Sequence, residues 1–333
     1  LPSYAAGLPL TLQSSNDRFM ISMMIGGSLF ITGLVALFIR NGRIKTLVFT
    51  LLIALGVGQQ FYNANIFRRD WVNQQEIYWQ MAWRIPQMQP GTLLITDQLP
   101  VDYETDLSFT APINWIYAPD YRRSPVPYAI IYTEKRLGGS LPSLLSGEQV
   151  NMYLRTAAFE GSTSKAIVIY KPEYGCLRVL GSQWNDENTY AGKSSFLVKA
   201  IPLSDPALID VDSKNTPHLP FLSEPKHDWC YYYTRAELAR QQQDWQRINQ
   251  LLSEAISLGY QAGDPLEWLV FIEAQAMTGN IKEARELSNG AYESDHRTRK
   301  GLCQVWKRVE TNLPGLVKNP QMETILSELQ CNR

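Results

Sequence analysis

The sequence lacks the motifs that mark most cofactor-dependent and metal-dependent enzymes. Its 333 residues contain no GxGxxG or GxxxxGKS/T loop, no HExxH and no CxxC. Only three histidines occur, His218, His227 and His296, and they are scattered along the chain. Phosphate-binding loops need their glycines, and many zinc and triad sites need histidine. We therefore expect no cofactor, and no metal or triad site built on histidine, in these residues.

Charge is scarce in the first 90 residues. They carry seven Lys or Arg and three Asp or Glu, whereas the rest of the chain carries 53 charged side chains. The net charge is +4 for residues 1–90, −3 for 91–222 and −2 for 223–333. This asymmetry is typical of a membrane segment followed by a water-soluble, mildly acidic body. It disfavours nucleic acid as a partner, because neither soluble part has a surplus of Lys and Arg.

Two apolar stretches predict membrane-spanning helices. Residues 19–39 carry no charge, and as a helix they measure about 31 Å, close to the roughly 30 Å of a hydrocarbon core. A buried core helix and a signal peptide are the alternatives. The second stretch, 46–67, is less apolar after Gly58, so a re-entrant segment is the alternative to a second span.

The turn between these stretches predicts their orientation. Arg40, Arg43 and Lys45 place three cations in six residues, and Lys and Arg are enriched in cytoplasmic loops. We therefore predict a multi-pass protein of the cell membrane, with the lipid bilayer as a partner and residues 68–333 extracytoplasmic. Because the chain begins at Leu1, we also expect it to be a piece of a longer protein.

A further helix is expected over about residues 70–85, where apolar side chains recur at helical spacing before Pro86. It completes a membrane segment of residues 1–90. Trp71, Trp79 and Trp83 suit the aromatic belt of a membrane interface, but a helix packed on the soluble body has the same pattern. Both interpretations of this interfacial helix stay open.

Residues 91–222 are predicted to form a small α/β domain with a mixed sheet. Short runs rich in apolar, β-branched and aromatic residues predict strands; these are 92–96, 113–117, 128–132, 166–170, 176–180 and 196–201. The loop 171–175 predicts an antiparallel hairpin, and the apolar spacing in 147–160 predicts a helix. The proline-rich residues 203–225 are expected to be a linker.

The last segment, 223–333, is predicted to be an all-α tail that is independent of the sheet. Residues 244–255 and 280–291 match at an offset of 36 residues, and each follows another helical run, 231–242 or 266–277. Residues 297–311 predict a capping helix. The stretch 279–284 resembles the turn and second helix of a tetratricopeptide repeat. The first copy departs from that pattern at Gln243 and Ile248, and an unrelated pair of helical hairpins is the alternative.

Acidic residues cluster once, at Asp97, Asp102, Glu104 and Asp106, directly after the first predicted strand. Ligands often bind at the carboxyl ends of strands in α/β folds, so this loop is a candidate for a sugar hydroxyl or a divalent cation. Acidic loops more often only face water. Residues 210–212 match the DxD spacing of some glycosyltransferases, but so short a motif is frequent by chance.

The four cysteines, Cys176, Cys230, Cys303 and Cys331, all lie on the side predicted to be outside the cytoplasm, where disulfides form. They allow three pairings. A Cys176–Cys230 bridge would join the sheet domain to the tail, and a Cys303–Cys331 bridge would hold the C-terminus. Buried free thiols are the alternative.

The order of these parts resembles the C-terminal part of multi-pass membrane glycosyltransferases of the GT-C class, similar to protein O-mannosyltransferases. The resemblance rests on the basic turn between two spans, on residues 16–19 leading into the first span, and on the repeat-like stretch 279–284. It implies a polyprenyl-phosphate sugar donor, a protein or glycan acceptor, and a catalytic part upstream of Leu1. It assigns no catalytic residue here. Arg18 is a candidate donor-phosphate contact, and a topology-setting charge is its alternative.

The competing hypothesis is a non-catalytic, membrane-anchored interaction module that binds a partner through its helical repeats. Under either hypothesis we expect the fragment itself to be catalytically inert, because its residues provide no recognisable catalytic constellation.

Overall fold

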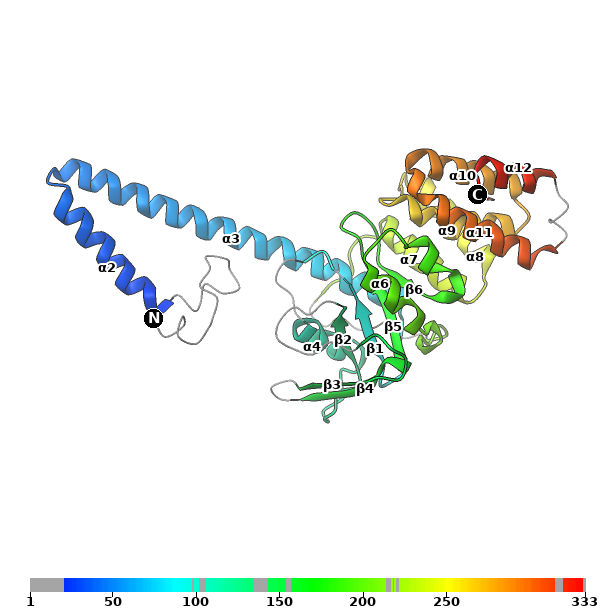
Figure 1. Ribbon diagram of the computed structural model, residues 1–333, viewed down its shortest axis with the longest axis horizontal. Coiled ribbons are helices and arrows are strands. Elements are labelled where there is room, and N and C mark those ends of the chain that lie inside the picture. Colours follow the sequence, from blue (N-terminus) through cyan, green and yellow to red (C-terminus); the bar gives the residue numbers. More distant parts are fainter. Residues whose placement is uncertain are drawn as a thin grey trace. The chain divides into compact units, whose positions relative to one another are not determined.

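The computed structural model describes residues 21–97, 99–101, 106–133, 143–153, 157–213, 217, 219, 222–314 and 320–331. The chain divides into two compact units, residues 1–73 and 74–333. The described part is mostly helical, with eleven α-helices and a small mixed sheet (Figure 1). Helix α3 contributes residues to both units.

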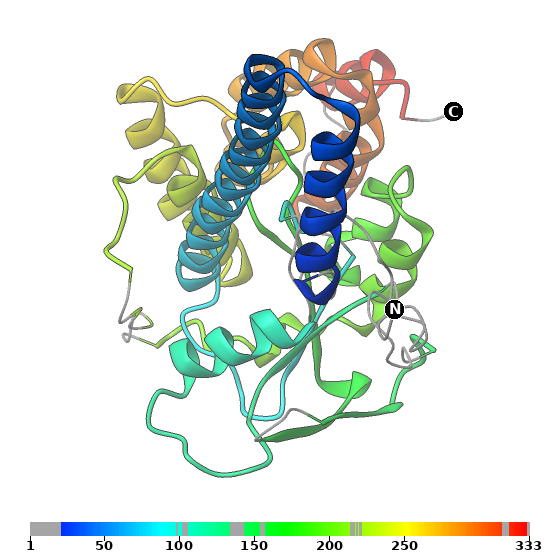
Figure 2. The ribbon, with the colours of Figure 1, turned by 90° about the vertical axis from the view of Figure 1, so that its left-hand side faces the viewer.

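The first unit contains α2 (Ile21–Phe38) and the first part of α3 (Gly42–Arg84), which a short turn joins (Figure 2). Of the described helices, α3 alone is long and apolar enough to cross a membrane, while the apolar part of α2 spans Met23–Phe38. The predicted first span also includes residues 19 and 20, which lie outside the described residues. The predicted segments 46–67 and 70–85 are not separate helices, because α3 runs through both.

The C-terminal end of α3 is buried in the second unit. Ile77, Met81 and Ile85 are at most 1% exposed, and the indole Nε1 of Trp83 donates a hydrogen bond to Glu224 Oε1 at 2.9 Å. A helix packed on the soluble body therefore describes this end better than an interfacial helix. Of the three tryptophans in the predicted helix, only Trp71 is exposed.

The main sheet has four strands in the order β2-β1-β5-β6. Strand β1 (Leu93–Thr96) is parallel to β2 (Ala129–Tyr132) on one side and to β5 (Ala166–Tyr170) on the other, and β6 (Arg178–Leu180) is antiparallel to β5. Alternate residues of the parallel strands enter two different hydrophobic clusters. Because both faces are covered, the strands are continuous apolar runs rather than alternating ones.

The predicted hairpin between β5 and β6 is present, and Gly175 shapes its loop. Gly175 has φ +152°, and a Cβ there would lie 2.8 Å from Glu267 Oε1 and from Pro172 Cγ. Only glycine allows the loop to approach this buried carboxylate so closely.

Three elements differ from the sequence prediction. Residues 113–117 are not a strand, because they form the last turns of α4 (Asp106–Tyr117), where Asn114 donates to Tyr128 O at 2.7 Å and ties the helix to β2. Residues 196–201 are not a strand either: α6 (Ser195–Ala200) begins where Ser194 Oγ accepts from Phe196 N. The predicted helix 147–160 is instead the hairpin β3 (Gln149–Tyr153) and β4 (Ala158–Ser162).

The first part of the predicted linker 203–225 is packed on the sheet rather than extended in solvent. Leu208 and Ile209 are buried, Gln89 N donates to Leu208 O at 2.9 Å, and Asp210 N donates to Gln87 O at 2.9 Å. The apolar residues between the prolines thus contribute to the core.

The tail is a succession of antiparallel helices. They are α7 (Trp229–Gln241), α8 (Trp245–Ser257), α9 (Trp268–Met277), α10 (Ile281–Ser294), α11 (Arg299–Asn312) and α12 (Pro320–Glu328). Consecutive helices from α7 to α10 pack against one another, and α11 packs on α9.

The internal repeat of 36 residues has a structural counterpart. In the α7–α8 turn, Asp244 N donates to Ala239 O, and in the α9–α10 turn Asn280 N donates to Gln275 O. Gln243 and Gly279 both have positive φ, 58° and 88°. The residue pairs Ile248 and Ala284, and Ala255 and Ala291, are all buried. The two turns therefore end and restart their helices in the same way.

The sequence predicts a tail that is independent of the sheet. In the structure, the tail and the sheet belong to the same compact unit, residues 74–333. Arg308 on α11 donates to the backbone oxygen of Trp184 at 2.6 Å, and α5 (Asp186–Thr189) packs on α11. The interface is built from buried polar side chains and from a disulfide, neither of which a hydropathy pattern reveals.

Candidate functional site

The topology of the sheet marks one edge as a place for ligands. The chain leaves β1 toward β2 on one side, while β5 lies on the other side of β1 and continues to β6. In open α/β sheets, ligands bind outside the carboxyl ends of strands where the direction of winding reverses. Here that position lies beyond Thr96 of β1 and Tyr170 of β5.

Asp97, the first residue after β1, is the only member of the predicted acidic cluster with a described side chain. Its Oδ1 accepts from Thr133 Oγ1 at 2.7 Å and from Ser194 Oγ at 3.1 Å. The carboxylate thus ties the segment after β2 and the N-terminus of α6 to the end of β1. These contacts give Asp97 a positioning role at the carboxyl edge.

The rest of the acidic cluster lies outside the described residues: Asp102 and Glu104 entirely, and Asp106 in its side chain, although its backbone begins α4. Within the described part of the chain, no group of three or more His, Cys, Asp or Glu side chains could hold a metal ion. The Asp210 and Asp212 carboxylates lie in an exposed turn, where Asp210 Oδ1 accepts from Asp212 N.

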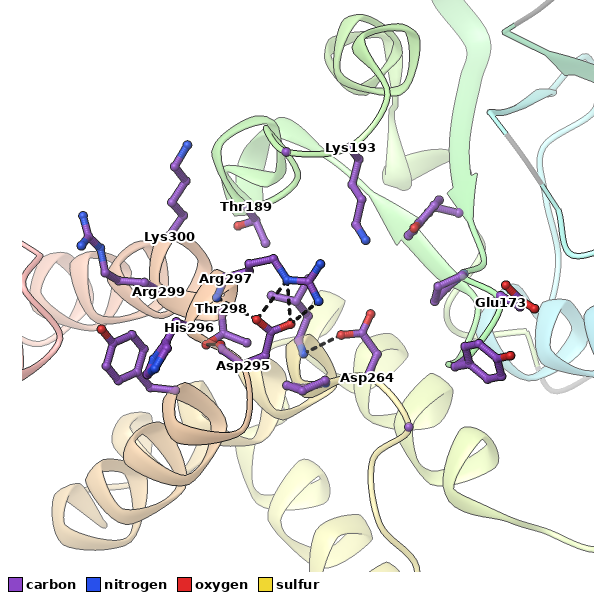
Figure 3. A pocket seen from close by; sticks show the side chains of 18 residues that line it. Glu173, Thr189, Lys193, Asp264, Asp295, His296, Arg297, Thr298, Arg299 and Lys300 are labelled. Carbon is purple, nitrogen blue, oxygen red and sulfur yellow. Dashed lines mark hydrogen bonds and ion pairs between the residues drawn. The ribbon is translucent and has the colours of Figure 1, made fainter.

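A cleft of about 750 Å³ lies beyond the carboxyl end of β5, between the sheet and the tail (Figure 3). One wall comes from the β5–β6 loop and the α5–α6 turn, and the other from the residues before α9 and around the start of α11. The α5–α6 turn carries Lys193 next to Ser194, so the hydrogen bond between Ser194 and Asp97 fixes this wall to β1. The volume lies within the roughly 300–1,000 Å³ of small-molecule sites.

The cleft is lined by seven charged side chains, which are Glu173, Lys193, Asp264, Asp295, Arg297, Arg299 and Lys300. Arg297 Nε donates to both carboxylate oxygens of Asp295 at 3.0 Å. These hydrogen bonds, with a further contribution from Lys193, lower the pKa of Asp295. Asp295 Oδ1 also accepts from Arg297 N at 2.9 Å, and so caps the turn that leads into α11.

Arg178 lies beneath the cleft and is 1% exposed. Its Nη2 is 2.8 Å from Asp264 Oδ2 and 3.4 Å from Glu267 Oε1, and its Nη1 donates to Tyr190 Oη at 2.8 Å. Glu267, which is fully buried, also accepts from Cys176 N at 2.6 Å and from Trp229 Nε1 at 2.7 Å. A buried charge with this many partners fixes the floor of the cleft between sheet and tail.

A second buried network holds α5, α7, α9 and α11 together. Arg240 pairs with Glu237 at 2.7 Å, and Arg308 binds both oxygens of Glu273 at 2.8 Å. Asp186 is 7% exposed, and its Oδ2 accepts from Gly181 N at 2.8 Å. Burial, aided by Glu237 and opposed by Arg240 and Arg308, raises the pKa of Asp186 to about 7.

The four cysteines form the bridges Cys176–Cys230 and Cys303–Cys331, the pairing considered from the sequence. The first joins the β5–β6 loop, two residues before β6, to α7, beside the Arg178–Glu267 contact. The second joins α11 to the segment after α12. Arg18, the candidate donor-phosphate contact, lies outside the described residues.

Sequence reasoning missed the cationic side chains of the cleft. The run His296-Arg297-Thr298-Arg299-Lys300 is visible in the sequence, and its density of cations was the available signal. Lys193 stands alone in the sequence, and only folding brings it to the same cleft. No protein-family model, no curated protein and no solved structure matches the chain.

Proposed function

We propose that this chain is the C-terminal part of a multi-pass membrane protein with residues 68–333 outside the cytoplasm, and that this extracytoplasmic part binds ligands or partners rather than catalyses. The observation that carries the proposal is the uncovered apolar surface of α2 and of the first part of α3. Ile25, Leu29 and Leu37 are 71%, 70% and 72% exposed, and Leu47, Ile53 and Leu55 are 66%, 66% and 62% exposed. A bilayer is the medium that removes so continuous an apolar surface from water.

The polar side chains of these helices support the same proposal. Ser28 Oγ donates to Met24 O, Thr46 Oγ1 donates to Gly42 O, and Asn65 Nδ2 donates to Phe61 O. Polar groups inside a bilayer must find partners within the protein, and bonding back to the preceding turn provides one.

The two disulfides support an extracytoplasmic location for the second unit. Disulfides persist in oxidising compartments and are rare in the cytosol, and all four cysteines of the chain are paired. The cations of the turn between α2 and α3, Arg40, Arg43 and Lys45, favour a cytoplasmic position for that turn. Both arguments give the same orientation.

For the whole protein, we propose a polyprenyl-phosphate-sugar-dependent glycosyltransferase of the GT-C class, with its catalytic part upstream of Leu1 and a protein or glycan as acceptor. The support is the order of parts together with the two similar helical turns at an offset of 36 residues, which fit tetratricopeptide-like repeats. In this proposal the second unit governs which acceptor reaches the membrane-embedded site.

Membrane insertion is tested with two leucines that are almost equally exposed. Leu51, on α3, is 55% exposed, and Leu258, after α8, is 58% exposed. An Arg at the centre of a span costs roughly 2.5–3.5 kcal/mol. We expect Leu51→Arg to raise the fraction extracted by alkaline carbonate, and Leu258→Arg to leave it unchanged. Equal extraction of both variants contradicts the membrane proposal.

Orientation is tested with an epitope tag after Arg333. Protease added to intact spheroplasts should remove the tag, and sealed inside-out vesicles should protect it. Protection in spheroplasts contradicts the extracytoplasmic location. Sugar transfer by the full-length protein from a polyprenyl-phosphate donor tests the transferase proposal, and a protein that transfers nothing but retains a bound partner favours the interaction module instead.

A further inference from the structure

We propose that the cleft between the sheet and the tail binds an anionic saccharide, meaning a sugar that carries a carboxylate or phosphate group. The proposal goes beyond the membrane and transferase proposals and does not depend on either, because it rests only on residues of the second unit.

The first argument is the charge of the lining. Four cations, Lys193, Arg297, Arg299 and Lys300, line the cleft together with the carboxylates of Glu173, Asp264 and Asp295. The guanidinium of Arg299 also donates to Gln330 Oε1 at 3.4 Å. Asp264 is already paired from below with Arg178 at 2.8 Å. Four cations against the two other carboxylates leave a net charge of +2 at the lining.

The second argument is the placement of Lys193. Figure 3 shows its side chain extending from the α5–α6 turn into the cleft, toward Arg297 and Asp295. Lys193 N donates to Tyr190 O at 2.9 Å, and the neighbouring Ser194 is bound to Asp97. Among the described side chains, Lys193 and Lys300 have no ion-pair partner, whereas Arg297 has Asp295. Two cations without an ion-pair partner, contributed by opposite walls of one cleft, favour an anionic ligand.

The third argument is the contrast with the rest of the unit. Residues 74–333 carry 25 Lys and Arg against 30 Asp and Glu, a net charge of −5. A nucleic acid or an anionic membrane surface needs a broad basic face, which this composition disfavours. A small anion experiences mainly the charges of the cleft, because solvent screens interactions beyond about 8–10 Å.

The fourth argument is the aromatic lining. Tyr170, Tyr174 and Tyr292 line the cleft together with Pro172 and Pro265. The rings of Tyr292 and His296 are 4.6 Å apart. A phenol ring offers an apolar face for the C–H side of a pyranose and a hydroxyl for its polar edge. Inorganic phosphate uses none of this surface, whereas a sugar with one acidic group uses both the rings and the cations.

The test is calorimetric titration of the full chain in lipid nanodiscs at low salt. The probes are trigalacturonate, a hexose phosphate, neutral maltotriose and inorganic phosphate. We expect at least one acidic sugar to bind about tenfold tighter than maltotriose and than inorganic phosphate, because it alone combines ion pairing with ring contact. The stronger of the two acidic sugars identifies the acidic group as carboxylate or phosphate.

Matched variants locate the site. Lys193→Gln and Lys300→Gln should each weaken binding of the tighter acidic sugar about five- to tenfold. Lys199→Gln on α6 and Lys307→Gln on α11 change lysines that are also exposed but are not in the cleft lining, and they should leave the affinity within about twofold. The proposal is overturned if maltotriose or inorganic phosphate binds as tightly as the acidic sugars, if no probe binds, or if the control variants lose as much affinity as the cleft variants.

Discussion

Asp186 makes the stability of the second unit depend on pH in an unusual direction. Its pKa is raised from an ordinary value of 3.8 to about 7, mainly by burial, while Arg240 and Arg308 oppose the shift. Between about pH 4 and pH 7 the folded protein therefore holds a proton that the unfolded chain releases. The slope of the free energy of unfolding against pH has the sign of the number of protons bound by the unfolded state minus the number bound by the folded state. For Asp186 this difference is negative between these two pH values. The contribution of Asp186 is thus greatest near pH 4 and is lost as pH rises to about 7.

The magnitude follows from the size of the shift. About three pKa units at 1.36 kcal/mol each give at most about 4 kcal/mol. A 1 kcal/mol change shifts Tm by roughly 2–4 °C in a domain of 150–250 residues, so the full effect approaches about 10 °C. Asp186→Asn removes the ionisation and retains an oxygen for the hydrogen bond from Gly181 N.

The assay is thermal unfolding, followed by tryptophan fluorescence, of wild type and Asp186→Asn at several values of pH. We expect the two Tm values to agree near about pH 4 and the variant to become progressively more stable toward about pH 8. Asp120→Asn, at an exposed loop position, should show no such pH-dependent difference. A variant that becomes less stable as pH rises would show that Arg240 and Arg308 keep the Asp186 carboxylate charged, and would refute the reasoning.

Four further variants, two at the disulfides and two at the helical turns, have definite expected outcomes. Cys176→Ser with Cys230→Ser opens a loop of 54 residues, which should lower the free energy of unfolding by about 4 kcal/mol. Cys303→Ser with Cys331→Ser opens a loop of 28 residues and should lower it slightly less. A larger loss for the shorter loop, measured by urea unfolding, would contradict the chain-entropy argument. Gln243→Gly should stabilise the α7–α8 turn by about 0.5–1 kcal/mol, because Gln243 has φ 58°. Gly279→Gln should destabilise the equivalent α9–α10 turn by a similar amount. A Gln243→Gly variant that is less stable than wild type, or a Gly279→Gln variant that is as stable as wild type, in thermal unfolding would show that the two turns are not equivalent.

The strands β1, β2, β5 and β6 were predictable because each is a short, buried run bounded by turn residues. Helix α4 is not predicted by the run 113–117, because on its own this run has the composition of a strand. Phe109, Ile113, Ile116 and Tyr117 are buried, whereas Trp115 is 54% exposed, a helical spacing that appears only when the window begins at Phe109. For residues 147–160 the apolar spacing predicts a helix, whereas the structure has a β-hairpin. Val150 and Phe159 are buried on the β3–β4 hairpin, and a few apolar residues matched a helical period by chance.

The candidate site was only partly predictable, because its parts come from distant positions. Asp97 at the carboxyl end of β1 followed from a local pattern, but its partners Thr133 and Ser194 are 36 and 97 residues away in sequence. The cations of the cleft come from the α5–α6 turn and from the start of α11. No period or motif connects these segments, since the interface that unites them depends on Arg178, Glu267 and the Cys176–Cys230 bridge.

The same interface determines how the cleft can respond to a ligand. Its sheet-side wall is bound to β1 through Ser194 and Asp97, and its floor is the Arg178–Asp264–Glu267 cluster. Residues 295–298 lead into α11, which begins at Arg299 and is held to α9 by the two hydrogen bonds between Arg308 and Glu273. Because these contacts hold both walls to the core, an anion that enters finds Arg297 already held in place by Asp295. Binding then orders few side chains beyond the two lysines, and this preorganisation favours a small acidic ligand over one that must reshape the surface.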